Sequence, residues 1–182
     1  MAFTPRLSDA GMYGNYYWYS GNPFYLAGYG LPNCTCYAWG RFYECGGVYP
    51  NLSTGNAEDW YYHGDGYARG STPALGAVLC LADGPYSGEG HVAVVEEIYS
   101  DGTILTSNSA WGGSYFYLQY LSPPYYLPAS GYVFQGFIYN PNAGGGPGPG
   151  PGPDPPGPGP TTASNAWLFK KWWWRRELEL IQ

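Results

Sequence analysis

The sequence has 182 residues, a net charge of −6 and many aromatic side chains, including 21 Tyr and 8 Trp. Its length suits one folded domain with a substantial core, and it contains no run of about 18 apolar residues that could span a membrane. Its basic residues gather near the C-terminus, and the acidic remainder would repel phosphate backbones, which argues against nucleic-acid binding.

Changes in composition divide the chain into three regions. Residues 1–140 alternate short apolar runs with Gly, Pro and Asn, as expected of a folded domain. Residues 141–160 are dominated by Gly and Pro and predict an extended linker. Residues 161–182 are too few to fold alone, and their "KKWWWRR" run favours weak contact with a membrane surface or a wall polymer. The alternative is a tail without a role.

The first clear element is a helix over the run "TCYAWGRFYEC" (residues 35–45), which follows Asn33 and stops at Gly46 and Gly47. Cys34 stands at its start. Unpaired backbone N–H groups and the helix dipole stabilise a thiolate there, so Cys34 is a candidate nucleophile. The alternative is a small buried side chain.

The other cysteines, Cys36, Cys45 and Cys80, do not indicate a metal site. A C-x-C pair followed by a cysteine nine residues later is not a usual zinc spacing, and no histidine pair completes it. The N-terminus lacks the basic and apolar regions of a Sec-type signal peptide, so disulfides are not the default expectation. We expect no metal and no cofactor.

The later elements are mainly strands. Residues 56–70 suggest a short helix and a loop, and residues 73–84 a buried strand. Two β-branched runs within residues 91–111 predict a hairpin around Asp101 and Gly102, and residues 132–139 predict another strand. An early helix followed by an antiparallel sheet places the chain in the α+β class. We expect the carboxylates of Glu96, Glu97 and Asp65 to be solvated.

A cysteine nucleophile needs a base within hydrogen-bond reach, and the chain offers His63 and His91. His63 lies in a Gly-rich aromatic stretch typical of a surface loop. His91 opens the strand "HVAVVEE" after a flexible "YSGEG", where a base is held firmly but stays accessible. His91 is therefore the expected base, and a structural histidine at a strand end is the alternative.

Three ordered motifs, "NCTCYAWGR", "PALGAVLCL" and "GHVAVVEEIYSDGTILTSNSAW", resemble the CHAP domain, the cysteine, histidine-dependent amidohydrolase/peptidase family. The resemblance spans about residues 13–140. It implies a papain-like α+β fold, cleavage of amide bonds in peptidoglycan, Cys34 as nucleophile and His91 as base. Asn108 fits the orienting residue that this family carries on the next strand. The related NlpC/P60 peptidases typically begin this helix with Asp-Cys-Ser, so the motifs favour CHAP.

Hairpin geometry argues against the role of Asn108. With a two-residue turn at Asp101 and Gly102, Asn108 would pair with Val95, roughly 13 Å along the strand from His91. A β-bulge or a longer turn is needed to bring Asn108 and His91 together. The oxyanion of the reaction would be held by the Cys34 backbone N–H and a side-chain donor, for which Asn33 is the candidate. Asn33 is equally expected to cap the helix.

These inferences predict a bacterial cell-wall hydrolase that acts on peptidoglycan without nucleic-acid partners. The bond is a muramoyl–L-alanine amide or a peptide bond. The apparent lack of a signal peptide suggests a phage endolysin, held in the host cytoplasm before lysis, or a virion-associated lysin. The alternative function is a non-catalytic wall-binding or phage structural module that retains the fold.

Overall fold

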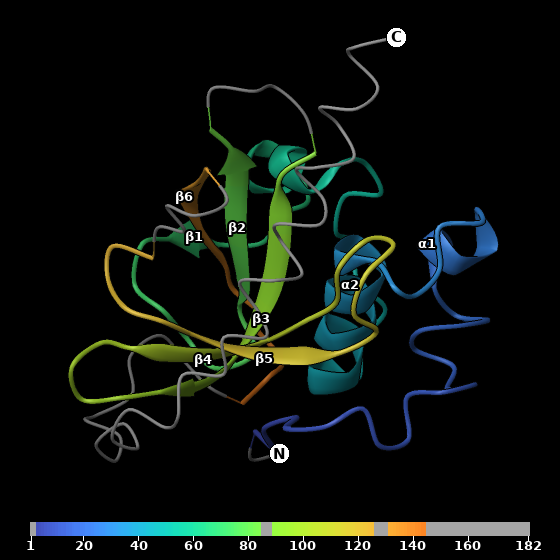
Figure 1. The fold of residues 1–182 in the computed structure, drawn as a ribbon. Coiled ribbons are helices and arrows are strands. Elements are labelled where there is room, and N and C mark those ends of the chain that lie inside the picture. The colour runs from blue at the N-terminus through green and yellow to red at the C-terminus, as the bar shows by residue number, and fades with distance from the viewer. Residues whose placement is uncertain (1–2, 85–88, 126–130, 145–182) are drawn as a thin grey trace, which may run out of the picture.

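The computed structural model describes residues 3–84, 89–125 and 131–144, and a six-stranded antiparallel sheet lies at its centre (Figure 1). The strands are β1 (Arg69–Gly70), β2 (Val78–Asp83), β3 (His91–Ile98), β4 (Ile104–Asn108), β5 (Tyr117–Leu121) and β6 (Tyr132–Ile138). Their order across the sheet is β1-β6-β2-β3-β4-β5. In Figure 1, β4 and β5 run across the lower ends of β2 and β3, so the sheet is strongly curved.

Three helical segments accompany the sheet: α1 (Pro23–Leu26), α2 (Cys34–Gly46) and the 3-10 helix η1 (Ala57–Tyr62). Helix α2 has the expected ends. The Asn33 side chain accepts a hydrogen bond from the Thr35 N–H, and Gly47 closes the helix with φ 65°, a left-handed conformation that glycine adopts readily. The predicted helix is therefore confirmed. The short helix predicted within residues 56–70 is η1.

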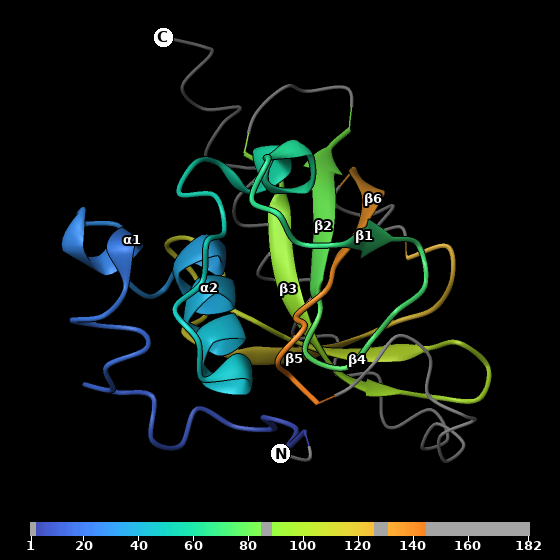
Figure 2. The ribbon, with the colours of Figure 1, turned by 180° about the vertical axis from the view of Figure 1, so that it is seen from behind.

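Helix α2 packs on one face of the sheet, as Figure 2 shows from behind. Alternation along β2 sends Val78 and Cys80 into the helix-side core and Leu79 and Leu81 into a second apolar cluster. Both faces of β2 are therefore covered, which explains the continuous apolar run in its sequence. The helix-side core also holds three fully buried indoles, those of Trp18, Trp39 and Trp60.

A buried ion-pair network joins α2 to β3. Arg41 donates from Nε to Glu96 Oε1 (2.9 Å) and from Nη2 to Glu96 Oε2 (2.7 Å), and Glu96 is fully buried. Arg41 also pairs with Glu44, which binds Arg6 of the N-terminal segment. Asp65 is likewise buried and paired with Arg69. The expectation that Glu96 and Asp65 are solvated was wrong: Glu96 pairs with the buried Arg41 of α2, and Asp65 pairs with Arg69, four residues later and partly buried.

The α+β class is confirmed, with the helix that carries Cys34 packed on an antiparallel sheet. The strands predicted within residues 73–84, 91–111 and 132–139 are present, whereas β5 and the short β1 and α1 were not anticipated. None of the helices in the described ranges is long and apolar enough to cross a membrane. Most of the predicted linker and all of the predicted tail lie outside the described residues.

Candidate active site

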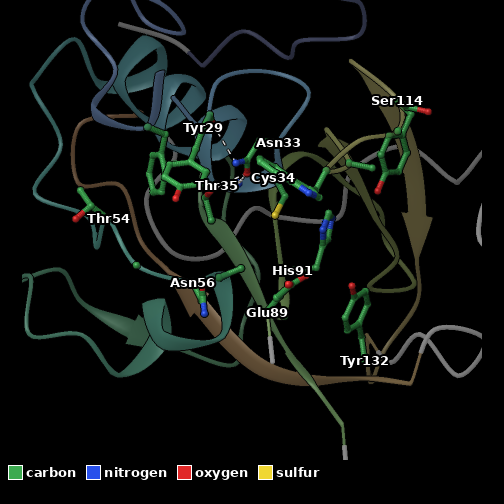
Figure 3. Close-up of a pocket in the computed structure, with 18 of the residues that line it drawn as sticks. Tyr29, Asn33, Cys34, Thr35, Thr54, Asn56, Glu89, His91, Ser114 and Tyr132 are labelled. Atoms are coloured by element: carbon green, nitrogen blue, oxygen red, sulfur yellow. Dashed lines mark hydrogen bonds between the residues drawn. The ribbon is translucent and has the colours of Figure 1, made fainter. Parts of the chain in front are cut away.

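A cleft of about 570 Å³ opens beside the first turn of α2 (Figure 3). Its walls come from the loop before α2, the segment before η1, the start of β3, the loop after β4, and strands β5 and β6. Cys34, His91 and Asn33 all line it. The fold thus brings together three of the predicted site residues from segments far apart in the sequence.

Cys34 is the first residue of α2 and is partly buried in the cleft. Its position is fixed by the segment that follows β4. The backbone N–H of Asn33 donates to Ser109 Oγ (3.0 Å), and Ser109 Oγ donates to the backbone oxygen of Ser114 (3.2 Å). The start of α2 is therefore tied to the chain that directly follows β4. In Figure 3 the sulfur of Cys34 and the ring of His91 both project into the cleft.

His91 is held by Asn108, the residue predicted to orient it. The distance from His91 Nε2 to Asn108 Oδ1 is 3.0 Å, and both side chains are buried. Asn108 Nδ2 donates to the backbone oxygen (3.2 Å) and to Oγ1 (3.0 Å) of Thr106, so the amide oxygen faces the imidazole. An amide oxygen only accepts, so His91 Nε2 carries the proton and Nδ1 is left free to accept one.

The hairpin reaches this contact through a different register from the simple two-residue turn. The loop spans residues 100–102 and is closed by a hydrogen bond from the Tyr99 N–H to the Thr103 oxygen (2.8 Å). The register then shifts again between Val95 and Glu97, so Val95 pairs with Thr106. Asn108 consequently lies two positions nearer to His91 than a two-residue turn would place it. A longer loop and a bulge together bring the two side chains together.

Burial sets the protonation states of the pair. It raises the pKa of the Cys34 thiol to about 11, although backbone N–H groups of Val92, Thr35 and Cys34 itself favour the thiolate. Burial also lowers the pKa of His91, and the hydrogen bond to Asn108 opposes this only in part. At neutral pH the free protein thus holds a thiol beside a neutral imidazole. This arrangement suits proton transfer during attack rather than a preformed ion pair.

Asn33 has its side chain engaged as a helix cap. Its Oδ1 accepts from the backbone N–H (2.9 Å) and the hydroxyl (2.7 Å) of Thr35, while Nδ2 donates to the Tyr29 oxygen (3.1 Å). The capping role, one of the two expected from the sequence, is therefore present. The second amide hydrogen of Asn33 remains available at a cleft-lining position, and its oxyanion role stays a prediction.

Several aromatic side chains complete the cleft. Tyr132 stacks on the His91 ring with centroids 5.9 Å apart and an angle of 17° between the planes. Burial, together with the negative charge that Cys34 would carry, raises the pKa values of Tyr117 and Tyr132, so both rings stay protonated donors near the sulfur. Tyr29 and Trp111 are half exposed and pack against each other at 6.0 Å. No periodicity in the sequence singled out these residues, because they meet from the loop before α2, the loop after β4 and the starts of β5 and β6.

The remaining candidate groups lie elsewhere. His63 is exposed at the end of η1 and does not line the cleft, in agreement with its predicted surface position. Cys36 is fully buried in the helix-side core, and all four cysteines are free. Within the described ranges, no group of three or more His, Cys, Asp or Glu side chains could hold a metal ion.

Comparison with known proteins agrees with the motifs. Residues 24–110 match the family model of the CHAP domain. Among curated relatives, a probable autolysin (LDP) of Staphylococcus aureus is 39% identical over 87 residues, covering 47% of this chain and 30% of the relative. A second probable autolysin of that species (SsaALP) is 31% identical over 125 residues, covering 66% of this chain and 43% of the relative. The chain spans less than half the length of these proteins.

A solved N-acetylmuramoyl-L-alanine amidase from Staphylococcus aureus also shows similarity, with 24% sequence identity and a TM-score of 0.46. The match covers 60% of this chain and 31% of the amidase.

Proposed function

Because residues 24–110 form a CHAP domain, we propose that this protein hydrolyses amide bonds of bacterial peptidoglycan with Cys34 as the nucleophile. One observation carries the proposal: Cys34, at the start of α2, shares a cleft with His91, whose ring Asn108 orients so that Nδ1 is free. A thiol, a base and an orienting amide form the constellation that covalent amide hydrolysis requires.

The reaction proceeds in two halves. His91 Nδ1 takes the thiol proton while the Cys34 sulfur attacks the amide carbonyl, and the resulting oxyanion accepts a hydrogen bond from the Cys34 backbone N–H. The imidazolium, which Asn108 Oδ1 stabilises, then returns the proton to the leaving amine as the C–N bond breaks. Water activated by His91 hydrolyses the thioester and releases the acid product, which restores the thiol.

The proposal extends to the scissile bond, the origin and place of action of the protein, and the oxyanion donors. The scissile bond is a muramoyl–L-alanine amide or a peptide bond of the stem or cross-bridge. A phage origin, action at the wall after cytoplasmic or virion storage, and weak wall or membrane contact through residues 161–182 stay predictions from the sequence. Asn33 is kept as a second oxyanion donor beside its observed capping role.

The experiment is mass spectrometry of the muropeptides released when the full chain digests purified Gram-positive walls. We expect wild type to create new termini and Cys34→Ala to lose at least about 10⁴-fold in rate. Cys36→Ala is the matched control, because this buried thiol lies outside the cleft. Equal release by wild type and Cys34→Ala would refute the assignment of the nucleophile. No release by wild type from several wall types would favour a non-catalytic wall-binding or structural module.

A further inference from the structure

Glu89 gives the cleft a negative charge that the proposed reaction does not use. Glu89 is separated from the start of β3 by Gly90, is exposed, and lines the cleft with Cys34 and His91. Of the described residues that line this cleft, Glu89 has the one charged side chain at neutral pH, because burial keeps His91 neutral. In the view of Figure 3 it lies between Asn56 and Tyr132.

The backbone around Glu89 is fixed against η1. The backbone N–H of Glu58 donates a hydrogen bond to the backbone oxygen of Glu89 (3.2 Å). Gly90 has φ 64°, and a Cβ added there would lie 2.6 Å from the Leu81 oxygen and 2.7 Å from the Glu58 nitrogen. Only glycine fits this close contact. The backbone that carries the Glu89 carboxylate is therefore held in a defined position, two residues before the base His91.

No cation within the described ranges pairs with this carboxylate. The arginines of the described residues, Arg6, Arg41 and Arg69, are engaged with Glu44, Glu96 and Asp65. Among the residues that the structure describes, Glu89 accordingly faces the cleft without an arginine partner that would compete with a bound cation.

The charge of Glu89 also acts on the nucleophile. It contributes to the raised pKa of the Cys34 thiol and to that of the Tyr132 hydroxyl, although burial is the larger cause for both. A carboxylate so placed opposes the formation of a thiolate. A positively charged group on the bound substrate would offset this effect of Glu89 on the pKa of Cys34. Substrate binding would then make the thiolate easier to form during the reaction.

We propose that Glu89 binds a protonated amino group of the substrate and selects peptidoglycan peptides that carry a free amine near the scissile bond. The amine belongs to the side chain of a diamino acid in the stem or to the free end of a cross-bridge. This inference rests on the proposed hydrolase function and adds the substrate class to it. Charge-assisted hydrogen bonding supplies the selectivity.

The test compares two soluble muropeptides that differ only in whether this amine is free or acetylated. For the full-length wild type we expect kcat/KM to favour the free amine by about tenfold, and the preference to weaken as salt is raised. Glu89→Gln should bring the ratio close to one. Asp59→Asn is the matched control, since this exposed carboxylate on η1 does not line the cleft and should leave the ratio as in wild type.

Binding of the same two peptides to Cys34→Ala, measured by isothermal titration calorimetry, separates this inference from the hydrolase proposal. A preference for the free amine that Glu89→Gln abolishes in this background supports the role of Glu89 even without turnover. Equal affinity for the two peptides, no binding of either, or a preference that survives Glu89→Gln would overturn it.

Discussion

At the scale of single residues, the Cys34–His91 pair is organised by what surrounds it. Burial disfavours both the thiolate and the imidazolium, so the charged pair forms only as the carbonyl is attacked. Asn108 contributes a neutral acceptor, which holds the ring and supports the imidazolium modestly. The acid limb of the activity should therefore lie below the ordinary histidine value of 6.5.

Asn108→Asp tests this arrangement. A carboxylate in place of the amide stabilises the imidazolium and raises the pKa of His91. Since the reaction needs the neutral ring, activity would then be lost at a higher pH than in wild type. The measurement is kcat/KM on a soluble muropeptide between pH 4 and pH 8. An acid limb that does not move in Asn108→Asp would show that His91 does not control it.

At the scale of elements, the site depends on how firmly α2 is held on the sheet. Two contacts do this, one at the start of the helix and one near its middle. The backbone N–H of Asn33 donates a hydrogen bond to Ser109 Oγ, directly after β4. Arg41 forms a bidentate ion pair with the fully buried Glu96 of β3. The bulge that carries Asn108 toward His91 also includes Glu96, so one irregularity of β3 serves both the packing and the site.

Arg41→Met should therefore lower the free energy of unfolding by about 3–5 kcal/mol, because it leaves the Glu96 charge buried without its partner. Denaturant unfolding measures this loss. The double variant Arg41→Met/Glu96→Gln removes the charge as well and should recover part of it. A double variant that is less stable than Arg41→Met would show that Glu96 tolerates burial without Arg41.

At the scale of the whole molecule, stability should fall as the pH falls, in two steps. The folded-state pKa of His91 is lowered, so the unfolded chain takes up a proton first as the pH drops below about 6.5. Burial raises the pKa of Glu44, but Arg6 and Arg41 outweigh it and lower the net value. The stability from Glu44 is present above its ordinary value of 4.5 and lost as the pH falls below it.

Thermal unfolding at pH 7.5, 6, 5 and 4 checks both steps. In His91→Asn the decrease in Tm between pH 7.5 and pH 5 should shrink, whereas the decrease near pH 4 should remain. His63 provides the matched control, since His63→Asn replaces an exposed histidine and should keep both steps. A wild-type Tm that stays constant from pH 7.5 to pH 5 would contradict the first step.

The sequence alone determined the features that depend on neighbouring residues. Asn33 and Gly47 define the ends of α2 because capping is local chemistry, and the β-branched runs of β3 and β4 predict a hairpin for the same reason. With two histidines in the chain, the strand after "YSGEG" was enough to favour His91 as the base. These residues required no knowledge of distant contacts.

Only the tertiary structure decided where distant side chains meet. The register that brings Asn108 to His91 comes from a loop and a bulge, neither of which the alternation of β3 encodes. The burial of Glu96 depends on an arginine 55 positions away in sequence. The placement of Glu89 beside Cys34 requires η1 to hold the chain before β3. Such contacts join segments far apart in the chain, and local propensity does not specify them.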